Sequence, residues 1–128
     1  MQGFVDDIEG LTEANEDFRR VLYTGRHLQL VVMAVRPGEE TGEEVHEDRD
    51  QFFRIESGEG EIWINGRRHK VGPDSGVIVP QGAKHNVVCT GDEPLRLYTI
   101  YGPPEHVDGT VHVTCDDAAQ AHEHFDGV

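Results

Sequence analysis

The feature that most constrains the fold is a rhythm of short runs of β-branched and aromatic residues, which begins at Phe18 and continues to Tyr101. Clusters of Gly, Pro, Asn and Asp separate these runs, as turns separate strands. The pattern predicts strands at residues 18–23, 27–35, 43–47, 51–56, 60–64, 67–71, 77–79, 85–89 and 95–101. Short strands with tight turns indicate an all-β sandwich or a jelly-roll barrel rather than an α/β arrangement.

The Asn65-Gly66 pair between two of these runs predicts a β-hairpin with a type I′ turn, because both central residues of that turn need positive φ. Residues 1–17 are polar, and within them 11–17 could form a helical turn or a loose arm. Alanines and alternating charges near the C-terminus are consistent with one short helix. We therefore expect one domain, with an N-terminal arm at 1–17, a barrel at 18–115 and a C-terminal helix or tail at 116–128.

Acidic residues dominate the charged positions, since 25 Asp and Glu face 11 Lys and Arg, for a formal net charge of −14. This charge argues against nucleic acid or anionic membranes as partners. Among the basic residues only Lys70 and Lys84 are lysines. An acidic, lysine-poor surface is typical of proteins from a salt-rich cytoplasm, and ordinary acidic proteins show it too.

The sequence contains no apolar run long enough to span a membrane, and its first residues lack the basic and apolar regions of a signal peptide. We therefore expect a soluble, cytoplasmic protein. The cysteines Cys89 and Cys115 show no paired spacing, which gives little support to a disulfide, a redox pair or a zinc site.

Several side chains with metal-binding groups fall at related strand positions. Because strand side chains alternate between faces, His46 and Asp48 should share one face. A turn at 49–50 would let a new strand begin at Gln51, on the same face as Phe53. That face should be the barrel interior, where a polar amide needs a partner.

The segment at 38–60, GEETGEEVHEDRDQFFRIESGEG, resembles the first motif of the cupin superfamily, G-x5-H-x-H-x3,4-E-x6-G. His46 stands in the place of the first histidine, and Gly58 is the closing glycine. Asp48 replaces the second histidine, and Gln51 replaces the glutamate after a shorter gap than the family pattern has. Gln51 nevertheless lies seven residues before Gly58, as the family's glutamate usually does.

The second cupin motif, G-x5-P-x-G-x2-H-x3-N, is matched by Pro80, Gly82 and His85. Cys89 stands in place of its asparagine and Asp74 in place of its leading glycine. The chain is similar to small single-domain cupins described as related to mannose-6-phosphate isomerase, which is a likeness of fold and not of reaction.

The resemblance covers roughly residues 36–101 and implies a cupin barrel, that is, a double-stranded β-helix or jelly roll. It also implies one divalent metal ion held by His46, Gln51 and His85, with Asp48 as a fourth ligand. Imidazole, amide and carboxylate donors suit Mn, Fe, Ni, Co or Zn. The neutral Gln51 leaves more positive charge on the ion than a glutamate would, which favours anionic ligands.

Each of these positions also has a plainer interpretation. Gln51 could hydrogen-bond only within the barrel, and Asp48 could orient a histidine or lie as a solvated charge at the rim. His106 and His112 could close over the pocket mouth, but we favour a surface position for both. We expect the other histidines, His27, His69, His122 and His124, on the surface. Candidates for contact with a substrate are Phe53, Trp63, Tyr98, Tyr101 and His106, although aromatic residues at strand spacing are more often core.

Three functions are compatible with the sequence. The first is a metal-dependent enzyme that isomerises, epimerises or oxygenates a small polar or anionic molecule, although the sequence identifies no catalytic base. The second is a non-catalytic module that binds a small ligand such as a sugar or carboxylate. The third is a metal-free barrel, against which the motifs argue. Small cupins often pair by exchanging N-terminal strands, so the resemblance and the β-rich segment 18–35 predict a homodimer.

Overall fold

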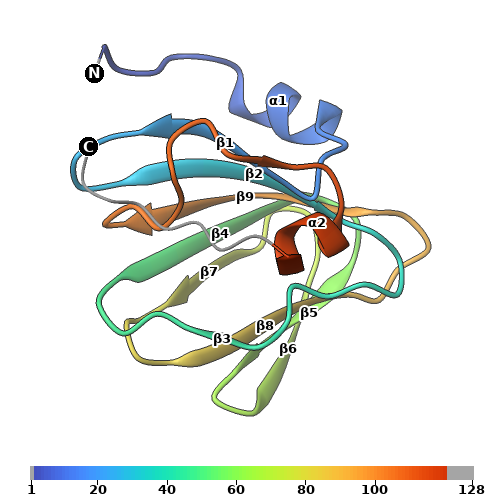
Figure 1. Cartoon of the computed structure of the whole chain (residues 1–128). Coiled ribbons are helices and arrows are strands. Elements are labelled where there is room, and N and C mark those ends of the chain that lie inside the picture. Colours follow the sequence, from blue (N-terminus) through green and yellow to red (C-terminus); the bar gives the residue numbers. More distant parts are fainter. Residues whose placement is uncertain (1, 121–128) are drawn as a thin grey trace.

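The computed structural model describes residues 2–120, and residues 1 and 121–128 lie outside the described part. Within that part, strands form two facing sheets, with one short helix near each end (Figure 1). The strands are β1 (Arg19–Thr24), β2 (Gln29–Val35), β3 (Glu44–Val45), β4 (Asp50–Ser57), β5 (Gly60–Ile64), β6 (Arg67–Val71), β7 (Gly76–Val79), β8 (Lys84–Cys89), β9 (Leu95–Gly102) and β10 (Val111–His112). The helices are α1 (Ile8–Ala14) and α2 (Cys115–Gln120).

The two sheets have the strand orders β10-β1-β2-β9-β4-β7 and β3-β8-β5-β6, and their paired strands are antiparallel. Some neighbours in each sheet are distant in sequence, as in β2 against β9 and β5 against β8, whereas β1–β2 and β5–β6 are consecutive. This arrangement is the jelly-roll barrel that the β rhythm and the motif resemblance predicted. All nine predicted strands are present, with ends that shift by a few residues at most.

The core lies between the sheets because the strands alternate apolar and polar side chains. In β9, Leu95, Leu97 and Thr99 are each 0% exposed, while the residues between them are partly exposed. Ile62 from the opposite sheet is also 0% exposed and belongs to the same cluster as the two leucines. Burying one such side chain contributes about 1.5–3 kcal/mol relative to leaving it in water.

Strand β2 is buried on both faces because α1 covers its outer side. Val31 points into the core, whereas Val32 and Ala34 lie on the opposite face and are also buried. Helix α1 contacts β2, β4 and β9. Its N-cap is Asp7, whose Oδ1 accepts a hydrogen bond of 3.1 Å from the Gly10 N–H and so satisfies a free helix donor.

The predicted hairpin at Asn65-Gly66 is confirmed. It joins β5 to β6, and Asn65 and Gly66 have φ of 49° and 82°, as a type I′ turn requires. By contrast, the turn predicted at 49–50 lies instead at Glu47-Asp48, because β3 ends at Val45 and β4 already begins at Asp50.

The segment after β9 returns to the barrel instead of remaining at the surface. His112, on β10, is 7% exposed and His106 is 6% exposed, so the surface position favoured for both is wrong. The reason is that β10 pairs with β1, while the Gln29 side chain accepts hydrogen bonds from the backbone of Glu105 and His106.

The short C-terminal helix is present as α2, and the remainder of the predicted helical tail lies outside the described residues, together with His122 and His124. His27 and His69 are exposed, as predicted. Both cysteines are free. Among residues 2–120, neither α1 nor any other helix is long and apolar enough to cross a membrane.

Candidate metal centre

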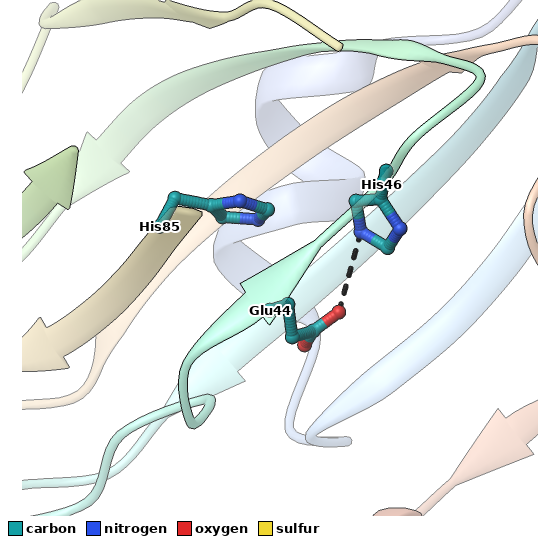
Figure 2. Close-up of side chains that lie close together, drawn as sticks. All are labelled: Glu44, His46 and His85. Carbon is teal, nitrogen blue, oxygen red and sulfur yellow. Dashed lines mark ion pairs between the residues drawn. The ribbon is translucent and has the colours of Figure 1, made fainter. Parts of the chain in front are cut away.

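Strands β3 and β8 bring three metal-binding side chains together inside the barrel. Their antiparallel register pairs Glu44 directly with His85. His46 follows Glu44 by two residues, and the alternation of side chains returns it to the same side of the chain. Figure 2 shows the three side chains converging, with His85 reaching from β8 toward His46.

The donor atoms of Glu44, His46 and His85 all lie within 4.8 Å of one another. His46 Nε2 is 3.3 Å from Glu44 Oε2, and the two imidazole rings are 5.4 Å apart between centroids. Ligand bonds of about 2.0–2.2 Å place donors on opposite sides of one ion about 4 Å apart. The three groups are therefore close to the spacing at which a single ion could bind them.

Gln51 lies beside this group and is 4% exposed. Its Nε2 donates a 2.9 Å hydrogen bond to Thr99 Oγ1, which leaves its Oε1 buried without a partner in the described chain. Nδ1 of His85 is buried and unpartnered in the same way. Buried polar atoms without partners are rare in proteins. Two such atoms at one site therefore indicate that an ion or a water molecule binds between them.

A small cavity lies at this position, with a volume of about 10 Å³. Glu44, Gln51 and His85 line it together with Phe53 and Tyr101. That volume is about what one water-sized group occupies. The cavity, the unpartnered atoms and the imidazole and carboxylate donors thus fit a single metal ion.

The surroundings of Glu44 and His85 shift the pKa values of both side chains toward the protonation states that bind a metal. Burial by itself raises the pKa of Glu44. The hydrogen bond with His46 and the positive charges of Arg19 and the histidines outweigh this effect, so the pKa of Glu44 is lowered overall. Burial lowers the pKa of His85, although the Glu44 charge opposes the effect. Near neutral pH, Glu44 is therefore a carboxylate and His85 a neutral imidazole.

A second layer of side chains positions His46. Its Nδ1 lies 3.6 Å from Glu105 Oε1, and Arg49 donates a hydrogen bond to that same carboxylate. The ring of Tyr101 packs edge-on against His46 at 5.7 Å and against His106 at 5.2 Å between centroids. Carboxylate partners of this kind orient histidine ligands in metal sites.

Asp48 is not part of the group that the structure brings together. Its side chain is 72% exposed and lies 3.3 Å from an Arg49 nitrogen. The reason is local, since the chain turns at Glu47-Asp48 and the alternation of faces does not continue past His46. Glu44 occupies the position beside the histidines instead. The alternation of strand faces puts Glu44, two residues before His46, on the same side as His46, and the β3–β8 register then brings it to His85.

The aromatic candidates fall into two groups. Phe53 and Tyr101 are both 2% exposed and line the cavity, and His106 Nε2 lies 3.3 Å from Tyr101 Oη. Trp63 lies against Arg68, whose guanidinium is 4.4 Å from its ring centroid, and Tyr98 lies 6.4 Å from Phe52. Neither Trp63 nor Tyr98 lines the cavity.

Comparison with known proteins agrees with this architecture. Residues 31–101 match the family described as the Cupin domain. The chain is 44% identical to the uncharacterized protein YrkC of Bacillus subtilis (strain 168), over 94% of this chain and 68% of that protein. It is 34% identical to the uncharacterized protein L612 of Acanthamoeba polyphaga mimivirus, over 88% of this chain and 72% of that protein.

Among solved structures, the chain resembles that of BH2720 from Bacillus halodurans, with a TM-score of 0.91 and 43% identity. That similarity covers 94% of this chain and 96% of the other. A family match over more than half of the chain, relatives matched over most of their length and the observed jelly roll agree with one another. The chain therefore belongs to the cupin family.

Proposed function

We propose that this protein is a metal-binding small cupin that binds or converts a small anionic molecule at its metal centre. One divalent ion, drawn from Mn, Fe, Ni, Co or Zn, would be held by Glu44, His46 and His85, with Gln51 Oε1 as a further donor. The observation that supports this most directly is that the donor atoms of Glu44, His46 and His85 lie within 4.8 Å of one another, with Glu44 and His85 lining a small cavity inside the barrel.

The chemistry of the donors supports the choice of ion and of ligand. Imidazole, carboxylate and amide donors suit the first-row divalent metals. With Glu44 as the one charged donor, the site keeps a net positive charge and favours an anion. When bound, such an ion supplies Lewis acidity. Phe53 and Tyr101 are buried and line the cavity. Glu105 lies against His46, and Arg49 in turn donates a hydrogen bond to the Glu105 carboxylate.

The pair formed by Tyr101 and His106 favours conversion over binding alone. His106 Nε2 is within 3.3 Å of Tyr101 Oη, and Tyr101 lines the cavity. A tyrosine hydroxyl in contact with an imidazole can hold or pass on a proton. This contact supports a role for Tyr101 and His106 in proton transfer to a ligand at the cavity.

The test is the metal content per chain, measured by elemental mass spectrometry on untagged protein. We expect nearly one Mn, Fe, Ni, Co or Zn ion per chain in the wild type and a large loss in His46→Ala and in His85→Ala. His27→Ala and His69→Ala are matched controls, because both histidines are exposed, and they should keep the ion. A wild-type protein that holds no ion even after reconstitution would contradict the proposal.

A further inference from the structure

A second cavity adjoins the metal centre on the side of α2. Its volume is about 110 Å³, against about 10 Å³ for the inner cavity. Arg19, Thr41 and Glu44 line both cavities and so form the boundary between them. The outer wall comes from Phe18 and from α2, drawn in red in Figure 1, through Cys115, Ala118 and Ala119.

Arg19 at this boundary is a buried cation with unused donors. It is 7% exposed. One Nη donates to His112 Nδ1 at 3.2 Å, and the other lies 4.0 Å from Glu44 Oε1, too far for a hydrogen bond. Its Nε is buried and has no partner among residues 2–120. A guanidinium carries five N–H donors, so most of those of Arg19 are not paired by these contacts.

A buried arginine with unpaired N–H donors is suited to bind an anion. A buried donor without an acceptor costs free energy, and a carboxylate presents two acceptor oxygens that match the guanidinium fork. Glu44 is an ion-pair partner of Arg19 at 4.0 Å but does not accept a hydrogen bond from it, and its carboxylate lies closer to His46, at 3.3 Å. Among the described residues that line the two cavities, Arg19 is the one Lys or Arg. A single cation beside the charged Glu44 favours a monoanion over a phosphate dianion.

We infer that the cavity beneath α2 binds a small monocarboxylate, with its carboxylate on Arg19 and its uncharged body against Phe18 and the alanines of α2. This inference rests on the proposed function, because it names the class and the position of the molecule that reaches the metal centre. It also assigns to α2 the role of a wall of the ligand site.

The first test is calorimetric titration with propionate, which is a monoanion with an apolar body and a weak metal ligand, at fixed ionic strength. Wild type should bind propionate and not its neutral isostere propionamide. Arg19→Met should raise the Kd roughly tenfold or more, as expected for loss of a charge-assisted hydrogen-bond pair. Arg20→Met is the matched control, because the Arg20 side chain is 53% exposed and pairs with Asp17. Unchanged binding in Arg19→Met, or tighter binding of phosphate than of propionate, would overturn the inference.

A second measurement on the wild type does not depend on how Arg19→Met folds. Cys115 borders the cavity and is partly exposed, whereas Cys89 is buried. Propionate should slow the alkylation of Cys115 by iodoacetamide, followed by peptide mass spectrometry, and propionamide should not. Equal labelling rates with and without propionate would overturn the inference.

Metal analysis of the same samples separates the two proposals. Protein that holds its ion but shows no propionate protection refutes only the carboxylate site. Protein that contains no metal but is protected by propionate refutes only the metal centre and leaves Arg19 as an anion site.

Discussion

Glu44 links the two halves of the site electrostatically. Its carboxylate lies 3.3 Å from His46 on one side and 4.0 Å from Arg19 on the other. These neighbours lower its pKa despite its burial, so it is ionised near neutral pH. An ionised Glu44 can act as a metal donor, and at the same time it offsets part of the charge that Arg19 brings into the barrel.

We predict that Glu44→Gln weakens metal binding while Asp48→Asn does not. The first change removes the one charged donor of the centre. Mutation of residues that only hydrogen-bond to a metal ligand already changes metal affinity by about 10–100-fold. We therefore expect a rise in metal Kd of about tenfold or more for Glu44→Gln. The Asp48 side chain is 72% exposed, and its change should leave the Kd within about twofold.

The measurement is competition for the metal against a chromophoric chelator. Asp48→Asn is a matched control because it makes the same acid-to-amide change four residues along the same segment. Loss of affinity in Asp48→Asn with none in Glu44→Gln would contradict the assignment of Glu44 and favour Asp48 as the ligand.

At the scale of elements, the turns that connect the strands differ in how much they tolerate a side chain. Gly58 and Gly66 both have positive φ, at 87° and 82°. A Cβ on Gly58 would lie 2.4 Å from the carbonyl oxygen of Pro94, while a Cβ on Gly66 would meet nothing within 4 Å. The loop after β4 is therefore packed against the start of β9, whereas the β5–β6 hairpin turn is open to solvent.

We predict that Gly58→Ala destabilises the protein more than Gly66→Ala. Left-handed backbone costs a non-glycine residue about 1–2 kcal/mol, which is the whole cost expected at Gly66. At Gly58 the clash with backbone adds about 1–3 kcal/mol, for a loss of about 2–5 kcal/mol in the free energy of unfolding. Urea denaturation of both variants measures the difference, and equal losses would contradict the close approach to Pro94.

At the scale of the whole molecule, the outer edge of the six-stranded sheet is incompletely covered. On that edge, β10 pairs with β1 at Arg19 and Arg20, and backbone hydrogen bonds at Phe18 and Val21 flank this pairing. Among the described residues, Tyr23 and Thr24 at the end of β1 pair with β2 alone. The N-terminal segment also exposes apolar groups, with Val5 at 99% and Phe4 at 37%. Unpaired strand edges and exposed apolar side chains are the features through which copies of a β protein associate.

We accordingly propose that the protein forms a homodimer through its N-terminal strands. Sedimentation equilibrium over a wide range of protein concentration should give the mass of two chains. Val5→Asp would place a charge in the exposed N-terminal segment and should weaken the association. A mass of one chain at every concentration would contradict the proposal.

The sequence by itself determined the strands and their faces. Alternation in segments such as 95–101 and the Asn65-Gly66 turn depend on residues near one another, and local chemistry sets both. The motif resemblance likewise identified the family and predicted His46 and His85 as site residues, and the structure brings these two side chains together.

The tertiary structure alone decided which neighbours complete the site. Glu44 meets His85 because β3 pairs with β8 in one particular register, and Arg19 meets His112 because a two-residue strand returns to β1. Asp48 lies away from the metal centre because the chain turns two residues earlier than predicted. Such pairings join distant parts of the chain, and their register depends on the packing of the whole barrel, so local patterns do not specify them.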